Sequence, residues 1–274
     1  MSAKIVLSRL PIDYRRFAHL GMFRHGDMQG YDYALGVVRY HASQAGIDLQ
    51  GKTCLELGPG DGITGGLVAR SLGAQHVYLV DAGAFADADI SLYQTHCEAM
   101  RSAGLAPPDI THVQDFGELL HAAGLTYLTN GLSDLQALPP DHLDFVWSHA
   151  VLEHVRAGEF GATMQALARS MRPGARASHR VDLQDHLANS LHNPRFSTKL
   201  WEQDWLANSG FYTNRIGHQP MLDLFTAAGF TVHDVTDIDR WDRLPLPREK
   251  FATEFRTIPD AELTISSFTA ILQR

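Results

Sequence analysis

The residues best suited to binding a ligand form a glycine-rich turn, Glu56–Gly62 (ELGPGDG). Its glycines let the backbone approach a ligand closely and adopt conformations closed to other residues. Asp81 follows Gly60 by 21 residues and stands at the end of the next apolar run, HVYLV. A carboxylate in that position can accept hydrogen bonds from both hydroxyls of a ribose. The turn and Asp81 together predict a site for a nucleoside-containing ligand.

The third position of the turn and its carboxylates narrow the choice of ligand. A dinucleotide site has the pattern G-x-G-x-x-G. Gly58 and Gly60 fit that pattern, but Ile63 occupies the third glycine position. Glu56 and Asp61 would repel a pyrophosphate and would suit an ammonium or a sulfonium. S-adenosylmethionine carries both groups, a ribose and no phosphate, so it is favoured over a nicotinamide cofactor. A phosphate-binding P-loop is excluded because no Gly-Lys-Ser/Thr follows.

Strands and helices must alternate to place these residues at one edge of a sheet. Residues 31–45 have helical spacing, with Tyr33, Val37, Tyr40 and Gln44 on one face, and Gly46 ends that helix. Further helices are predicted around 63–72, 91–103, 116–123, 150–155, 160–171 and 221–228. Strands are predicted over 52–57, 76–80, 125–129, 143–148, 176–181, 230–235 and 263–272. This alternation predicts an α/β domain with a seven-stranded, mostly parallel sheet covered on both faces.

Two regions stand outside that alternation. Residues 1–50 are predicted to form an N-terminal helical extension that covers the ligand, and 51–274 the main domain. Residues 183–216, after the fifth strand, interrupt the pattern and are predicted to be an insertion on the substrate side. Trp201 and Tyr212 could wall a substrate pocket, and Arg215 could bind an acidic group. The alternative is that the aromatic residues fill a small core of their own.

Four segments in order carry a family resemblance: LELGPGDG, VYLVD, SDLQALPPDHLDFVWSHAVLEHV and LARSMRPGA. They resemble the successive motifs of class I S-adenosylmethionine-dependent methyltransferases, and the likeness covers about residues 50–182. It implies a Rossmann-like, doubly wound fold and methyl transfer that leaves S-adenosylhomocysteine. The motifs are specific for the superfamily and not for a substrate.

Matching positions imply roles for single residues. Gly58, Pro59 and Gly60 would face the methionine part of the cofactor, with Glu56 or Asp61 near its ammonium. Asp81 would hold the ribose hydroxyls and Ala82 would lie against the adenine. Asp134, four residues before Leu138-Pro139, would reach the adenine amine, with Leu135 beside the ring. His149 would lie near the transferred methyl group.

Histidines follow the fourth and fifth strands, where parallel sheets bind ligands. His149, His154 and His179 are candidate general bases, which would take a proton from the acceptor. Some relatives have a Glu-x-x-Glu-His metal site here. This chain keeps Glu153-His154 but has Ala150 in place of the first glutamate. A divalent metal is therefore possible but not favoured, with Glu153, His154, His179 and Asp182 as weak candidate ligands.

Composition limits the partners. Lys and Arg total 23, Asp and Glu total 31, and the net charge is −8. Nucleic acid and anionic membranes need a basic surface, so neither is expected as a partner. Two cysteines cannot form a disulfide framework, no secretory signal is visible, and a cytoplasmic protein is expected. No apolar stretch is long enough to span a membrane. The oligomeric state stays open.

The predicted function is transfer of a methyl group from S-adenosylmethionine to a small molecule or a sugar, at oxygen or nitrogen. Two other classes remain open. The same fold could bind this cofactor and cleave it, cyclise it or transfer another group. It could also be a non-catalytic binding module. A nicotinamide dehydrogenase is the weakest reading, because of Ile63 and the two carboxylates at the turn.

Overall fold

A single seven-stranded sheet organises the chain. The computed structural model describes residues 30–185 and 190–274, so the first 29 residues of the predicted extension lie outside the described part. The strand order is β3-β2-β1-β4-β5-β7-β6. The bounds are β1 Thr53–Leu57, β2 His76–Val80, β3 Leu125–Leu128, β4 Leu143–His149, β5 Met171–Asp182, β6 Thr231–Arg240 and β7 Ile265–Gln273. β7 runs antiparallel to both neighbours, whereas β1 to β5 pair in parallel. The predicted fold is confirmed.

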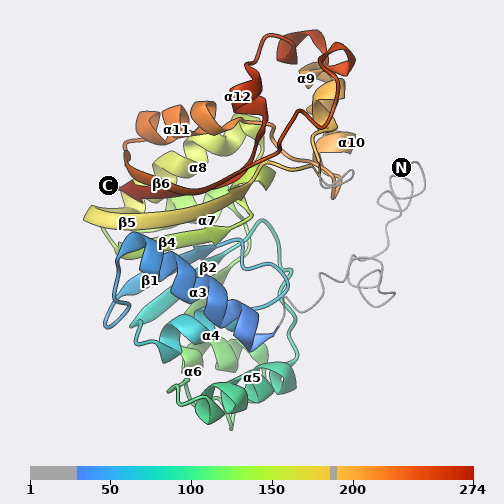
Figure 1. Ribbon diagram of the computed structural model, residues 1–274. Coiled ribbons are helices and arrows are strands. Elements are labelled where there is room, and N and C mark those ends of the chain that lie inside the picture. The colour runs from blue at the N-terminus through green and yellow to red at the C-terminus, as the bar shows by residue number, and fades with distance from the viewer. Residues whose placement is uncertain (1–29, 186–189) are drawn as a thin grey trace.

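Helices cover both faces of this sheet (Figure 1). The first face carries α3 Tyr31–Ala45, α4 Thr64–Ser71, α5 Ile90–Ser102 and α6 Phe116–Ala123. The opposite face carries α7 Leu132–Ala137, α8 Ala157–Ser170 and α11 His218–Ala227. Each face buries its own apolar core, with Phe145 and Trp147 in the first and Phe160 and Phe225 in the second. This is the doubly wound arrangement, which leaves the carboxyl edge of the parallel strands open for a site.

The structure corrects several predicted elements. The buried face of α3 consists of Ala34, Val37, Val38, His41 and Ala45. It is displaced by about one residue along the sequence from the predicted face. Gly46 ends α3 as predicted, because its φ of 62° suits glycine. Residues 150–155 do not form a helix. They contain only the 3₁₀ turn Leu152–His154, preceded by Ala150 at a φ of 55°.

Three further differences concern lengths and short elements. β5 begins at Met171, because the strand continues past Pro173-Gly174 with an irregular pairing to β4 and a φ of 81° at Gly174, where the sequence predicts a turn. β6 continues to Arg240 and includes register shifts near Asp237 and Asp239. The six-residue helix α7 was not predicted, since it is too short to show a helical period.

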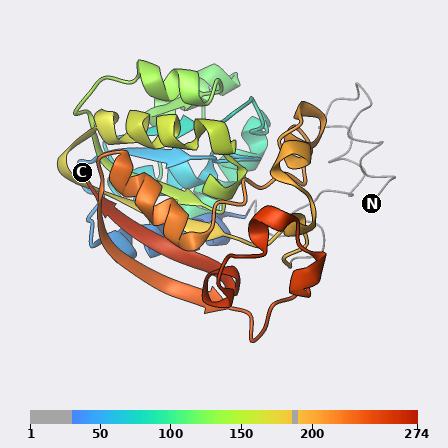
Figure 2. The ribbon, with the colours of Figure 1, turned by 90° about the horizontal axis from the view of Figure 1, so that it is seen from above.

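Two insertions, not one, project from the carboxyl edge. Residues 183–216 contain the 3₁₀ turn Asn193–Arg195, α9 Thr198–Trp201 and α10 Asp204–Ala207. Residues 241–264 contain the 3₁₀ turns Arg248–Lys250 and Thr253–Phe255 and α12 Asp260–Leu263. β6 runs parallel to β5, so both insertions leave the same edge, and they gather beyond one end of the sheet (Figure 2).

Backbone contacts join these two insertions to each other. The Ala252 amide donates to the Pro194 carbonyl at 2.8 Å, and the Thr198 amide donates to Glu254 Oε1 at 2.7 Å. Leu191 of the first packs with Leu246 and Phe251 of the second in a small separate core. In the part of the chain that is described, no helix has the length and apolar character that a membrane crossing requires.

Candidate active site

The glycine turn and Asp81 meet as the sequence predicted. The turn leads from β1 into α4, with Gly58 and Gly60 at φ values of 73° and 66°. The Gly60 amide donates to Asp81 Oδ2 at 3.0 Å, and the Ala82 amide donates to Asp81 Oδ1 at 2.7 Å. Burial and the nearby Asp61 raise the pKa of Asp81, and the two amides oppose that rise. The acid is thus preorganised where β2 ends, with Pro59 and Asp61 in the same turn, both partly exposed.

Glu56 lies beneath this turn at the end of β1. Burial raises the pKa of its carboxyl group to about 7, the Trp147 indole opposes that rise, and Asp81 adds to it. Its Oε2 is buried and has no hydrogen-bond partner among the described residues. Gly65 of α4 packs against the Glu56 carboxylate. A Cβ at this position would overlap Glu56 Oε2, so a larger residue would collide with the carboxylate. A buried carboxylate oxygen without a hydrogen-bond partner is costly, and an ammonium group of a ligand would supply a donor.

The region assigned to adenine is built around Gly131. Its φ of 51° and ψ of −121° are open only to glycine, and its amide donates to the Asp81 carbonyl at 2.9 Å. Asp134 lies in the first turn of α7, where its Oδ2 accepts a hydrogen bond from the Asn130 amide at 2.8 Å. Leu135 points into the apolar core. The predicted adenine contacts of Ala82, Asp134 and Leu135 stay predictions.

The loop after β4 packs directly against the glycine turn. A Cβ on Gly58 would lie 2.5 Å from Val151 Cγ2, which is too close for any residue but glycine. Ala150 has a φ of 55°, and its amide donates to the Arg180 carbonyl at 2.9 Å. A non-glycine residue in this conformation is strained and needs surrounding contacts to hold it. His149 is the last residue of β4 and therefore lies at the carboxyl edge, and the loop after it contacts the glycine turn through Val151.

His149 is tied to α3 through a second histidine. Its Nδ1 lies 3.1 Å from His41 Nε2, and His41 Nδ1 lies 2.8 Å from Ser178 Oγ. Burial, together with the positive charge of Arg180, lowers the pKa of His149. Burial lowers the pKa of His41 to about 2. Both rings are therefore neutral at pH 7, and Nε2 of His149 makes no hydrogen bond to the described residues.

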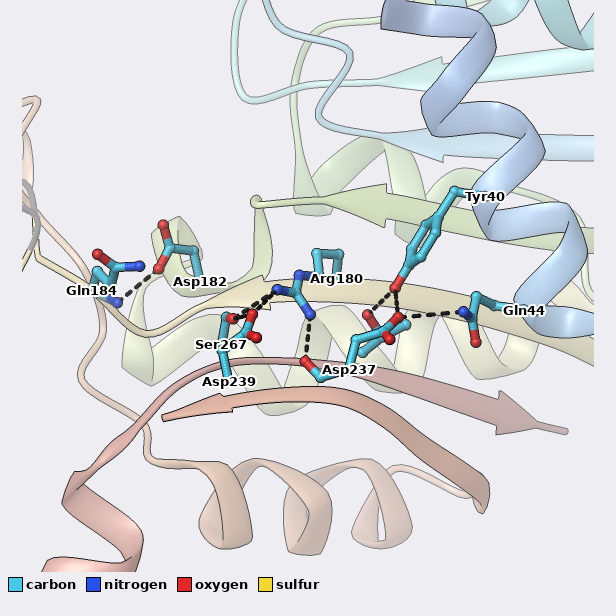
Figure 3. A network of polar contacts seen from close by, with 9 residues as sticks. Tyr40, Gln44, Arg180, Asp182, Gln184, Asp237, Asp239 and Ser267 are labelled. Carbon is cyan, nitrogen blue, oxygen red and sulfur yellow. Dashed lines mark hydrogen bonds and ion pairs between the residues drawn. The ribbon is translucent and has the colours of Figure 1, made fainter. Parts of the chain in front are cut away.

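Polar contacts fasten α3 to the far edge of the sheet (Figure 3). The Tyr40 hydroxyl donates to Asp237 Oδ2 at 2.5 Å, and Gln44 Nε2 donates to the same oxygen at 3.3 Å. Arg180 of β5 donates to the Asp237 carbonyl and to Asp239 Oδ2, both at 2.6 Å. The irregular stretch of β6 at Asp237 thus faces α3 and Arg180 together. These contacts fix the helix that carries His41.

His154 and His179 lie in different surroundings from His149. His154 is partly exposed, and its Nδ1 lies 3.0 Å from the Tyr212 carbonyl. His179 is fully buried, stacks on Phe225, and lies 2.8 Å through Nδ1 from Ser148 Oγ. Burial lowers the pKa of His179 to about 3. Because His179 lies in the core beneath α11, the geometry gives no support to its predicted role as a base.

The four weak candidate metal ligands do not converge. Among residues 30–185 and 190–274, no group of three or more His, Cys, Asp or Glu side chains could hold a metal. Glu153 is buried, and burial raises the pKa of its carboxyl group well above the ordinary value. Asp182 lies at the end of β5, where its Oδ1 accepts from the Gln184 amide at 2.9 Å. Glu153 is therefore a buried side chain rather than an exposed ligand at the carboxyl edge.

The three predicted substrate residues make contacts within the insertions, and Arg215 connects the first insertion to the second. Trp201 is buried and its Nε1 donates to the Thr213 carbonyl at 2.7 Å. The Tyr212 hydroxyl donates to Glu202 Oε2 at 3.1 Å. The Arg215 guanidinium lies 5.2 Å from the centre of the Trp201 ring and 4.8 Å from that of Phe255, and donates to the Phe196 carbonyl at 2.7 Å. These contacts match the alternative in which the aromatic residues form a core.

Sequence reasoning missed two residues next to the site. His41 was not singled out because a histidine inside a helical period carries no signal of its own. Tyr33, from the first turn of the same helix, stands edge-on to the His149 ring at 6.3 Å, and burial and the charge of Glu56 raise its pKa. Only the packing of α3 on the sheet shows that both belong near His149.

Solved structures that resemble this chain include two S-adenosylmethionine-dependent methyltransferases and a [4+2]-cyclase. An S-adenosylmethionine-dependent methyltransferase from Mesorhizobium loti shares 18% identity, with 89% of this chain and 100% of that chain covered and a TM-score of 0.49. One from Archaeoglobus fulgidus shares 12%, with 96% and 100% covered and a TM-score of 0.49. The cyclase SpnF shares 14%, with 89% and 82% covered and a TM-score of 0.48.

The family assignment comes from the sequence itself. Among curated proteins, a search finds no match to this chain. Residues 28–235, which contain the glycine turn, Asp81 and the loop after β4, match the family described as a methyltransferase domain. That match spans most of the chain, and it agrees with the resemblance in the four motifs. The chain belongs to the methyltransferase domain family, within the class I S-adenosylmethionine-dependent superfamily.

Proposed function

We propose that this protein transfers a methyl group from S-adenosylmethionine to a small molecule, at oxygen or nitrogen. The observation that carries the proposal is the joint placement of Asp81, Glu56 and the glycine turn at one point of the carboxyl edge. Asp81 offers two carboxylate oxygens to a ribose, and Glu56 offers a buried oxygen that lacks a donor. This donor set suits a cation-bearing nucleoside better than a phosphorylated one.

The protein's own residues would bind and orient both reactants. The Gly58 and Gly60 backbone, Glu56 and Asp81 would hold the cofactor, whose sulfonium supplies an electrophilic methyl group. His149 is the base we favour among the three predicted histidines, because its neighbouring loop contacts Gly58 and its Nε2 makes no hydrogen bond to the described residues. It would accept the proton that the acceptor loses. The paired insertions at the same edge would exclude water from the acceptor.

The acceptor is a small molecule in this proposal because two observations limit larger ones. The net charge of −8 disfavours nucleic acids. The two insertions stand beyond the carboxyl edge (Figure 2), and we expect them to limit the size of the acceptor.

Product analysis tests the proposed reaction. The purified protein is incubated with S-adenosylmethionine and panels of hydroxyl and amine compounds, and the nucleoside products are separated by mass. S-adenosylhomocysteine that appears only with an acceptor, in step with a methylated product, supports the proposal. Methylthioadenosine would instead indicate attack at another carbon and so the non-methyl alternative. Tight cofactor binding without turnover on any panel would favour the binding module.

A further inference from the structure

The pair His41 and His149 links the buried face of α3 to the carboxyl edge of the sheet. His41 is fully buried, between Ser178 of β5 and His149 of β4. Its two ring nitrogens are both engaged, by Ser178 Oγ at 2.8 Å and His149 Nδ1 at 3.1 Å. A buried histidine with both nitrogens engaged has a fixed ring orientation. His41 therefore determines what the Nδ1 side of His149 can do.

We propose that His41 and Ser178 are positioning residues that hold His149 as a base with a bare Nε2, for an acceptor that carries a hydroxyl group. In this arrangement His149 Nδ1–H donates to His41 Nε2, and His41 Nδ1–H donates to Ser178 Oγ. The lone pair of His149 Nε2, which accepts no hydrogen bond from the described residues, is then available to an acceptor. The inference rests on the proposed function and specifies the base and the acceptor group.

The reverse arrangement would serve a base poorly. If His41 Nε2–H donated to His149 Nδ1, the proton of neutral His149 would sit on Nε2, and that atom could only donate. A second proton on His149 would then place two N–H groups against each other and break the contact with His41. In the proposed arrangement the proton arrives at Nε2 while the Nδ1–H bond to His41 stays intact. Only that arrangement lets His149 gain a proton without loss of a partner.

The need for a base points to a hydroxyl rather than an amine. A neutral amine already has a nucleophilic lone pair, whereas a hydroxyl becomes a strong nucleophile only as its proton leaves. The hydroxyl proton moves to His149 Nε2, the O–H electron pair stays on the acceptor oxygen, and the imidazolium later returns the proton to solvent. Among residues 30–185 and 190–274, the charged and titratable groups that face His149 are Tyr33, Tyr40 and His41 of α3 and Arg180 of β5. Arg180 is the cation of this set, and burial together with its positive charge lowers the pKa of His149 and so favours a neutral resting base.

The tautomer of His149 can be read without knowing the acceptor. Long-range proton–nitrogen NMR of nitrogen-15-labelled protein, saturated with S-adenosylhomocysteine, distinguishes the two neutral forms and the imidazolium. The signals of the His149 ring are assigned as those lost in His149→Gln. We expect neutral His149 with its proton on Nδ1 at pH 7. A proton on Nε2, or an imidazolium at pH 7, would overturn the inference.

Variants of the two supporting residues test their role. In His41→Leu the acceptor of the Nδ1–H group is lost, and we expect His149 to shift to a mixture dominated by the Nε2–H form. His41→Gln, whose amide oxygen can accept, should restore the Nδ1–H form. If His41→Leu does not fold, Ser178→Ala carries the test, because it removes the partner that orients His41 and keeps the packing. An unchanged His149 tautomer in folded His41→Leu or Ser178→Ala would contradict the role of His41.

Cofactor binding separates this inference from the proposed function. Calorimetric titration of each variant with S-adenosylhomocysteine should give the wild-type affinity, because neither His41 nor Ser178 belongs to the cofactor residues. Loss of binding by the wild-type protein would overturn the proposed function. A wild-type protein that binds the cofactor but holds His149 as the Nε2–H form would overturn only the inference about the base.

Discussion

Asp81 and Gly60 are 21 residues apart in the chain and are joined by a hydrogen bond of 3.0 Å from the Gly60 amide to Asp81 Oδ2. The bond connects the end of β2 to the turn after β1. Parallel pairing of these strands, with Leu57 opposite Val80, brings the two residues to one edge. The acid is thereby held in place before any ligand binds, and orientation of this kind reduces the cost of binding.

Loss of the Asp81 carboxylate should weaken cofactor binding. In Asp81→Ala we expect the affinity for S-adenosylhomocysteine to fall by about 1–3 kcal/mol, the range for a hydrogen bond to a charged group. Isothermal calorimetry measures the change. Asp109→Ala is the matched control, since Asp109 is exposed in the loop before α6 and its side chain accepts hydrogen bonds from Thr111 rather than from the turn. Equal affinities of wild type and Asp81→Ala would show that the acid does not hold the ribose.

The two central glycines of the turn should differ in tolerance. Gly58→Ala combines a positive φ with a clash against Val151, whereas Gly60→Ala has the positive φ but no atom within 4 Å of the new Cβ. We expect Gly58→Ala to lose cofactor binding and Gly60→Ala to cost only about 1–2 kcal/mol of stability. The double variant Gly58→Ala with Val151→Ala should recover part of the binding. Thermal unfolding and calorimetry on all three decide the matter, and a Gly58→Ala protein that binds normally would refute the close approach.

Buried His179 should make folding sensitive to acid. Its pKa is about 3 in the folded protein and about 6.5 when unfolded. Between about pH 3 and pH 6.5 the unfolded chain binds a proton at His179 and the folded chain does not. The free energy of unfolding therefore falls as the pH falls below about 6.5. We expect the unfolding free energy of His179→Gln, relative to wild type, to rise by up to about 1.4 kcal/mol per pH unit on acidification. Urea unfolding at pH 7, 6 and 5 measures this, with exposed His121→Gln as control.

For the surface control His121→Gln, the difference in unfolding free energy from wild type should be the same at pH 7, 6 and 5. If His179→Gln and His121→Gln show the same dependence on pH, His179 is not held neutral in the core. Glu153 provides a test of the opposite sign, since burial raises its pKa. Glu153→Gln should gain stability relative to wild type as pH rises above about 4.5, where the unfolded glutamate ionises and the folded one does not.

Arg215 should stabilise the paired insertions. Arg215→Ala removes a cation from between the Trp201 and Phe255 rings and a hydrogen bond to the Phe196 carbonyl. We expect a loss of about 1–3 kcal/mol that is local to the insertions. Hydrogen exchange should accelerate across 193–213 and 248–256 and stay unchanged at 53–62. Arg195→Ala, exposed in the same insertion, is the control. Uniform exchange changes over the whole sheet would argue against this local role.

The cofactor part of the site could be predicted from the sequence, because its residues belong to short local motifs. The glycine turn and Asp81 follow two buried strands, so parallel pairing alone brings them together. The helical spacing predicts α3 over its full length, but the face that includes Tyr33 and Tyr40 is not the buried one. They lie instead at the rim, where their rings stand edge-on to His149.

The rest depends on contacts between distant segments. The second insertion has short 3₁₀ turns and no apolar period, so its packing on the first was invisible. The role of Arg215 was assigned to a substrate because a lone arginine among aromatic residues shows no partner until Phe255 folds against it. The role of His41 depends on its contacts with Ser178 and His149, which lie more than 100 residues away in the chain and so could not be predicted from the sequence.

Calorimetric titration of the purified, folded protein with S-adenosylhomocysteine tests the central claim most directly. The structure places a preorganised Asp81 and a buried Glu56 without a donor around one glycine turn, so we expect one ligand bound per chain with micromolar affinity. Prior removal of carried-over ligand, checked by mass spectrometry, makes an empty result meaningful. No heat and no stabilisation against thermal unfolding would contradict a cofactor site at this turn, and the proposed methyl transfer with it.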